Sequence, residues 1–172
     1  MSEEKKPTKY YSNKQEKILA SELGWAKIGG SGAAPCAPGD IRASEWLGEC
    51  KTHTKESAIL FDLGVWNKIK EEAYSRMKKP VLFVDDGSQK PDNTWCVCLA
   101  KNINASSLML TDLPMAVKKN ITFKDKEAKS ALKEVADIYV GEFYTGVAFE
   151  YEWNGETVLV MTFETFKGIY KK

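Results

Sequence analysis

The order of hydrophobic and polar residues predicts a chain in which helices alternate with short strands. Residues 12–23 carry apolar side chains at helical spacing, so we expect a first helix there. Ser12 and Gln15 have the spacing of a capping box at its start, and Gly24 has the position of a residue that ends a helix. The preceding residues 1–11 are charged and polar, and we expect them to form a flexible arm.

Further elements follow from the same patterns. A second helix is expected to begin at Asp62 or Gly64 and to end at residue 79, because Pro80 cannot continue it. Apolar runs predict strands at 80–84, 95–100, 108–110 and 147–153, and helical spacing predicts a helix at 123–139. Asn154-Gly155 predicts a tight hairpin turn, followed by a returning strand at 156–163 and a final helix at 164–170.

Between the first two helices, residues 40–43 and 46–52 are expected to form a β-hairpin. Because side chains alternate along a strand, Glu49 and Lys51 are expected on one face and Cys50 on the other. The same alternation, continued through residues 52–55, places further polar side chains on the face of Lys51.

Closing this hairpin can bring Asp40 across to the face of Glu49 and Lys51. Paired carboxylates suit Mg²⁺, which takes oxygen ligands and keeps several waters. A lysine beside such a site can orient a water or offset charge on a phosphate. The spacing alone leaves the alternative open that Glu49-Cys50-Lys51 is a solvated strand edge.

The motif residues carry a resemblance to a known family. Pro38-Gly39-Asp40, eight further residues and then Glu49-Cys50-Lys51 resemble the PD-(D/E)xK nuclease signature, although Gly39 separates the proline from the aspartate. The longer run GSGA…PGDI…WLGECKTHTKES resembles the Holliday-junction-resolvase-like branch that is common among phages and archaea. The resemblance covers about residues 12–84 and returns weakly near the C-terminus at VLVMTFETF.

This resemblance implies a restriction-endonuclease-like core, which is an α/β fold with a mixed central sheet flanked by helices. The flexible arm 1–11 would then precede a single nuclease domain, 12–172, with an insertion at about 101–143 and a C-terminal β-hairpin. It implies a Mg²⁺-dependent DNA endonuclease, with Mn²⁺ able to substitute, that acts on branched DNA. A junction has two-fold symmetry, so a homodimer is expected.

The resemblance also implies roles for individual residues. Asp40, Glu49 and the Cys50 carbonyl would hold Mg²⁺, Lys51 would position the attacking water, and Glu16 on the first helix would complete the site. Glu16 falls inside the apolar stripe of that helix, where an unpaired carboxylate is costly, whereas Glu22 lies toward the stripe's edge. The alternative for Glu16 is a structural glutamate that extends to solvent.

Candidate nucleic-acid contacts flank the motif. The glycine-rich loop with Ser31 and Gly32 can approach a phosphate through its backbone N–H groups, although such a loop can also be a plain linker. His53 and Lys55 would extend this contact along the strand after Lys51. His53 is the single histidine, so chemistry that needs a pair of histidines within one chain is excluded.

Composition narrows the class of protein. At 172 residues, with 43% hydrophobic and 28% charged residues, the sequence is that of one ordinary globular domain. No apolar run has the length of a membrane span and the N-terminus is no signal peptide, so we expect a cytoplasmic protein without membrane contact. The four cysteines lack the spacing of a zinc site, and we expect neither zinc nor disulfides.

Two other functions remain open at this point. A flap-directed or single-strand-directed nuclease would share the motif and differ only in its substrate groove. A non-catalytic nucleic-acid-binding module could keep the fold, but such a module is expected to have lost Asp40, Glu49 or Lys51, and all three are present.

Overall fold

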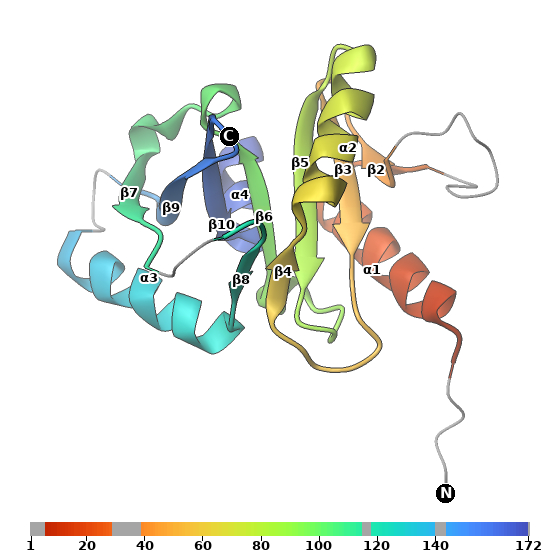
Figure 1. The fold of residues 1–172 in the computed structure, drawn as a ribbon, viewed down its shortest axis with the longest axis horizontal. Coiled ribbons are helices and arrows are strands. Elements are labelled where there is room, and N and C mark those ends of the chain that lie inside the picture. Colours follow the sequence, from red (N-terminus) through yellow and green to blue (C-terminus); the bar gives the residue numbers. More distant parts are fainter. Residues whose placement is uncertain (1–5, 29–38, 115–117, 140–143, 172) are drawn as a thin grey trace, which may run out of the picture.

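An eight-stranded mixed sheet forms the centre of the fold in the computed structural model, which describes residues 6–28, 39–114, 118–139 and 144–171 (Figure 1). The strands lie in the order β1-β2-β3-β5-β6-β10-β9-β7. Their bounds are β1 Ala26–Lys27, β2 Ile41–Arg42, β3 Trp46–Lys51, β5 Lys79–Asp85, β6 Thr94–Leu99, β7 Leu108–Asp112, β9 Gly146–Trp153 and β10 Glu156–Thr162. Two more strands, β4 (Ile59–Phe61) and β8 (Ile121–Phe123), pair with each other in a separate antiparallel ladder.

The central sheet is mixed because two of its ladders are parallel. β3 pairs with β5 in parallel, and β7 pairs with β9 in parallel, whereas the remaining neighbours are antiparallel. The expected α/β class with a mixed central sheet flanked by helices is therefore confirmed.

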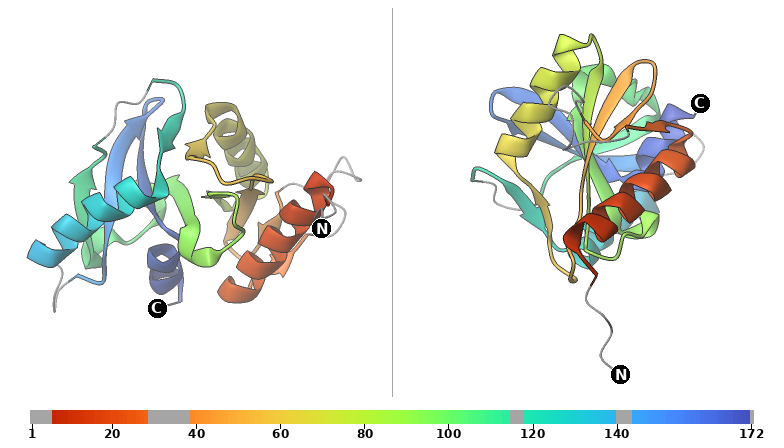
Figure 2. Two further views of the ribbon diagram at one scale, coloured as in Figure 1. Left: turned by 90° about the horizontal axis from the view of Figure 1, so that it is seen from below. Right: turned by 90° about the vertical axis from the view of Figure 1, so that its right-hand side faces the viewer.

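Four helices cover the two faces of this sheet: α1 Thr8–Leu23, α2 Leu63–Ser75, α3 Asp125–Tyr139 and α4 Phe163–Tyr170. Buried residues of α2 and α3 belong to one hydrophobic cluster, and those of α1 and α4 belong to another. Figure 2 shows α1 and α2 on opposite sides of β3 and β5. Within the described residues, no helix combines the length and apolarity that crossing a membrane requires.

The expected hairpin at the motif is confirmed. β2 and β3 pair antiparallel with Ile41 opposite Gly48, and the N–H of Ala43 donates to the Trp46 carbonyl at 3.0 Å to close the turn. The C-terminal hairpin is confirmed as well, since β9 and β10 pair around Asn154 and Gly155, both of which have positive φ.

The start of the first helix was predicted wrongly. α1 begins at Thr8, so part of the expected arm 1–11 is helical. Pro7 stands at the N-cap with φ −64°, a value that suits the start of a helix. Ser12 is consequently inside the helix, where its hydroxyl donates to the Thr8 carbonyl at 3.5 Å, and it is not a capping-box residue.

Two further boundaries differ from expectation. β3 ends at Lys51, so residues 52–55 do not continue the strand. The reason is local: the Thr52 hydroxyl donates to Asp85 Oδ1 at 2.6 Å, and the chain then leaves the sheet toward β4. α2 ends at Ser75, before the expected residue 79, because Met77 adopts a left-handed conformation with φ 54°.

Residues 101–143, predicted as an insertion, supply β7, β8 and α3. β7 forms an edge of the central sheet, and β8 pairs with β4. Phe123, the expected start of the helix, belongs to β8 instead, and α3 begins at Asp125. Ala128 and Leu132 of α3 face the core.

Candidate functional site

One cavity of about 690 Å³ collects all five residues that the sequence assigned to catalysis or metal binding. We call it the hairpin cavity; α1, β3, α2 and the residues before β2 line it. Its lining comprises Thr8, Lys9, Ser12, Asn13, Glu16, Gly39, Asp40, Glu49, Cys50, Lys51, Thr52, Lys68 and Glu72. The sequence therefore identified the residues that meet here, although 10 to 35 positions separate some of them along the chain.

Asp40 is fixed to the backbone of the neighbouring strand. Its carboxylate Oδ2 accepts a hydrogen bond from the Cys50 N–H at 2.8 Å, and its own N–H donates to the Gly48 carbonyl at 2.8 Å. The residue is 8% exposed. A carboxylate held in this way keeps its position against β3 without help from solvent.

Gly39, the residue before Asp40, lies in a position that requires glycine. It has φ 68°, and an added Cβ would lie 2.9 Å from the Leu47 side chain. Its N–H donates to Glu72 Oε2 on α2 at 3.0 Å. Only glycine fits this conformation and this close approach. Gly39 therefore lets the chain place Asp40 beside β3.

Glu49 and Lys51 form an ion pair on the same face of β3. The Lys51 amine lies 2.9 Å from Glu49 Oε1. Burial raises the pKa of Glu49, and the negative charge of Asp40 raises it further. Burial opposes the charged form of Lys51, but the charge and hydrogen bond of Glu49 outweigh it, with Asp40 adding to them, and the pKa of Lys51 is raised. The amine is therefore an ammonium at neutral pH, and it partly offsets two neighbouring carboxylates.

The two helix glutamates differ as their positions predicted. Glu16 is buried, and burial raises its pKa, while Lys27 on β1 lies 3.6 Å from its carboxylate. Glu22 instead reaches α4, where the Lys167 amine lies 2.5 Å from its carboxylate. Glu16 thus faces the hairpin cavity, whereas Glu22 joins two helices at the surface.

Gln15 is a residue of the site that sequence reasoning missed. It is 1% exposed, and its side-chain Nε2 donates to the Lys51 carbonyl at 2.7 Å. This bond joins α1 to the backbone of the residue that carries the amine. The sequence showed a glutamine among buried positions of a helix, but it could not show a backbone partner 36 residues away.

Lys68 and Glu72 were also missed as cavity residues. Lys68 lies on α2, and its side chain is 72% exposed. Both residues nevertheless line the hairpin cavity, one helical turn apart, and their charged groups lie 3.8 Å from each other. They add a cation and a hydrogen-bond acceptor to the α2 side of the cavity.

The predicted nucleic-acid contacts are not gathered in this cavity. Ser31 and Gly32 lie outside the described residues. His53 and Lys55 do not line the hairpin cavity. They follow the end of β3, so the prediction that they continue the strand on the face of Lys51 is wrong. The segment is held instead by Gln89, whose Nε2 donates to the Thr52 hydroxyl at 2.9 Å and to the His53 carbonyl at 3.0 Å.

Asp85 belongs to the same buried network. Its Oδ1 accepts from the Thr52 hydroxyl and from the Gly87 N–H. Burial raises the pKa of Asp85. The network fixes the backbone directly after Lys51.

The described residues contain no group of three or more His, Cys, Asp or Glu side chains that could hold a metal ion. Mg²⁺ sites, however, use one or two carboxylates and keep several waters. Asp40 and Glu49 supply two carboxylates in one cavity, close enough for the charge of one to raise the pKa of the other. This pair fits Mg²⁺; the metal-binding role expected of Glu16 and of the Cys50 carbonyl stays a prediction.

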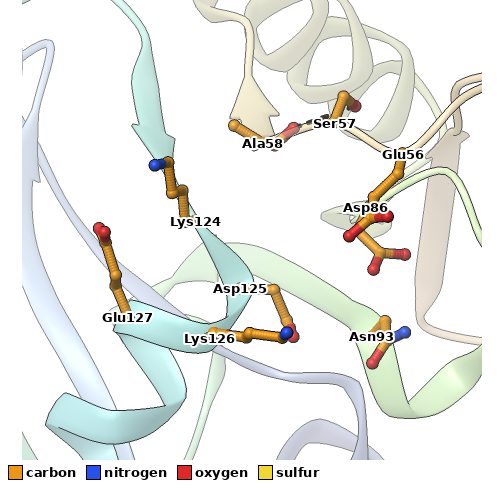
Figure 3. Close-up of a pocket in the computed structure, with 9 residues that line it drawn as sticks. All are labelled: Glu56, Ser57, Ala58, Asp86, Asn93, Lys124, Asp125, Lys126 and Glu127. Carbon is orange, nitrogen blue, oxygen red and sulfur yellow. Dashed lines mark hydrogen bonds between the residues drawn. The ribbon is translucent and has the colours of Figure 1, made fainter.

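A second cavity, of about 560 Å³, lies where the segment before β4 meets the start of α3 (Figure 3). We call it the α3 cavity. Figure 3 shows Glu56 and Asp86 on one side of it and Lys124, Lys126 and Glu127 on the other. None of the residues that the sequence assigned to catalysis lines it, so the candidate site is the hairpin cavity.

Cys50, Cys96 and Cys98 are buried, and they carry free thiols. Burial raises the pKa of each thiol, that of Cys98 to about 12. These thiols are therefore protonated at neutral pH and pack as uncharged side chains in the core.

Comparison with known proteins gave no relative: no protein-family model, curated protein or solved structure matches this chain. The function proposed below accordingly rests on the residues of the hairpin cavity and on the resemblance of the motif.

Proposed function

We propose that this protein is a Mg²⁺-dependent endonuclease that hydrolyses phosphodiester bonds in DNA, with branched DNA as its substrate. One observation carries the proposal: Asp40, Glu49 and Lys51 share one cavity, with the Lys51 amine 2.9 Å from Glu49. Two carboxylates and an ammonium at one place are the groups that metal-assisted hydrolysis of a phosphodiester needs.

The residues would divide the work as follows. Asp40 and Glu49 would hold Mg²⁺, which when bound would supply a Lewis acid toward the phosphate. Lys51 would hydrogen-bond the attacking water and offset charge that develops on the phosphate oxygens. Its raised pKa keeps it protonated, so it would act by positioning and by charge and would not remove a proton.

The rest of the site would keep these groups in place. The Cys50 N–H fixes Asp40, and Gln15 fixes the Lys51 backbone. Glu16 lies in the same cavity and would assist the metal shell. The restriction-endonuclease-like core belongs to this proposal: the pairing of the hairpin β2–β3 with the parallel strand β5, and helices on both faces, support it.

The preference for branched DNA and the homodimer come from the resemblance to junction-resolving nucleases. Two active sites related by two-fold symmetry would cut two opposite strands of the four that form a junction.

Cleavage assays on four DNA substrates test the function. Labelled four-way, flap, single-stranded and linear duplex DNA are incubated with the protein in Mg²⁺, in Mn²⁺ and in EDTA. We expect cutting in both metals, none in EDTA, and the highest rate on the four-way junction. Faster cutting of flap or single-stranded DNA would redirect the substrate assignment, and no cutting of any substrate would overturn the nuclease proposal.

A further inference from the structure

The side of the hairpin cavity formed by α1 carries a row of polar side chains outside the proposed catalytic group. Thr8, Lys9, Ser12 and Asn13 line the cavity together with Glu16. Their spacing of one, three and four residues puts them on one face of the helix, since a helix turns by about 100° per residue. The row therefore leads along α1 from its first turn to the buried glutamate.

Each member of the row offers hydrogen-bond donors. Lys9 has an ammonium, Thr8 has a hydroxyl and Asn13 has an amide. The Ser12 hydroxyl donates to the Thr8 carbonyl at 3.5 Å and would exchange this long bond for one to the ligand. The side-chain oxygen of Asn13 accepts from Lys27 at 3.4 Å, which leaves its NH₂ group as the donor. Lys9, Thr8 and Asn13 are exposed and Ser12 is half-buried, so a ligand in the cavity can reach them.

The length of the row matches a short stretch of a nucleic-acid strand. Eight residues separate Thr8 from Glu16, which corresponds to about 12 Å along the helix axis at ~1.5 Å per residue. Successive nucleotides of one strand advance by about 3.4 Å along a duplex. The row is thus long enough to reach beyond the single nucleotide at Asp40 and Glu49.

We propose that Thr8, Lys9, Ser12 and Asn13 form a binding subsite for the DNA backbone phosphates that flank the scissile phosphodiester. Hydroxyl, amide and lysine side chains are common donors to phosphate oxygens, and such contacts set the register of the DNA without reading its sequence. The identity of the ligand rests on the proposed nuclease function. The sequence predicted that Lys9 belongs to a flexible arm. In the structure Lys9 lies in α1 and lines the hairpin cavity, and the subsite follows from that position.

DNA binding measured in EDTA tests this subsite without requiring catalysis. The probe is a fluorescein-labelled four-way junction, and its affinity is measured over a range of salt concentrations. We expect Lys9→Ala to weaken binding about three- to tenfold and to reduce the slope of log affinity against log salt by about 1, because one phosphate contact is lost. Lys14→Ala is the matched control, since Lys14 is exposed on the opposite face of the same helix.

The neutral members of the row give a second signature. Ser12→Ala and Asn13→Ala should weaken binding while leaving the salt slope unchanged, because they release no counterion. A neutral methylphosphonate moved along the strand should, at one position near the cleavage point, weaken binding by wild type and leave Lys9→Ala unaffected. Such non-additivity identifies a direct contact.

The outcomes separate the subsite from the catalytic proposal. If wild type fails to cut in Mg²⁺ but shows the Lys9-dependent slope, the subsite stands and the nuclease assignment falls. If wild type cuts, but Lys9→Ala and Lys14→Ala have equal affinity and slope, the subsite is wrong. Absence of any DNA binding by the folded wild-type protein would also overturn it.

Discussion

The hairpin cavity and the α3 cavity have similar volumes, about 690 and 560 Å³, and acidic side chains line both. They differ in what their acids contact. In the α3 cavity, Asp125 accepts the Trp95 indole N–H at 2.8 Å and pairs with Lys129 at 2.9 Å, so it anchors a core tryptophan to α3. In the hairpin cavity, Asp40 and Glu49 lie near each other, and their mutual repulsion helps to raise the pKa of Glu49.

This difference shows which property identifies the candidate site. Neither volume nor the number of acids separates the two cavities. The hairpin cavity is distinguished by two carboxylates held where their charges disfavour each other, beside an ammonium that is 51% exposed. An arrangement that is electrostatically costly without a cation is the one expected of a metal site.

The largest expected effect comes from changing one acid in each cavity. Glu49→Gln should abolish cleavage because it removes a metal ligand, whereas Asp125→Asn should cut at nearly the wild-type rate. Asp125→Asn keeps an oxygen for the Trp95 N–H, so it should lose only about 0.3–0.5 kcal/mol of unfolding free energy from the ion pair. Cleavage rates and urea unfolding of both variants check this, and equal loss of activity would remove the distinction between the cavities.

Lys51 tests how the ammonium acts. Lys51→Ala should reduce the cleavage rate about a hundredfold, and Lys51→Arg should fail nearly as badly, because a displacement of about 1 Å can cost that much. Arginine keeps the charge but replaces a compact donor with a planar fork. The measurement is the single-turnover cleavage rate of wild type and of both variants at saturating Mg²⁺. Restoration of most of the rate by arginine would mean that charge alone suffices.

The two helix glutamates give a smaller contrast within α1. Glu16→Gln should reduce turnover by about a hundredfold, the order expected when a partner of a metal shell is lost. Glu22→Gln should change turnover little, because Glu22 pairs with Lys167 on α4 and does not line the hairpin cavity. If both variants lose the same activity, or if Glu16→Gln loses only stability, Glu16 is a structural residue.

The smallest expected effect is a pH dependence of Mg²⁺ affinity. The pKa of Glu49 is raised, so as pH falls Glu49 takes up a proton before an ordinary glutamate does, and Mg²⁺ must then displace that proton. Calorimetric titrations from neutral to mildly acidic pH should show weakening affinity and proton release. Glu49→Gln should lack this proton release, and its persistence in that variant would assign it to another group.

The protonation of Glu49 affects folding stability in the opposite direction from Mg²⁺ affinity. A raised pKa in the folded state means that the folded protein binds the proton more tightly than the unfolded chain does. In metal-free protein, the contribution of Glu49 to stability is therefore present at low pH and is lost as pH rises through the raised pKa.

The sequence predicted the candidate site better than it predicted the boundaries of the elements. Alternation along the strand placed Glu49 and Lys51 together, and the apolar stripe of α1 predicted the burial of Glu16. Pro7 could have predicted that α1 starts near Thr8, because the fixed φ of proline suits the start of a helix. The prediction of a strand through 52–55 failed because tertiary bonds to Thr52 overrode the local pattern.

Other features could not have been predicted from one sequence. β1, β4 and β8 have only two or three residues each, too few to show a period. The contact of Gln15 with the Lys51 carbonyl depends on how α1 packs against β3 and leaves no mark in residue spacing. In the same way, the packing of α1 brings Lys9 to the hairpin cavity, and the packing of α2 brings Lys68 there.

The most direct test of the account is the cleavage of a labelled four-way junction by wild type and by Asp40→Asn, with DNA binding measured in parallel. The account predicts that wild type cuts in Mg²⁺ and stops in EDTA. It predicts that Asp40→Asn folds and binds the junction but does not cut it, because an amide keeps the shape of the side chain and loses the charge that holds the cation. Full cleavage by wild type in EDTA, or by Asp40→Asn in Mg²⁺, would contradict it.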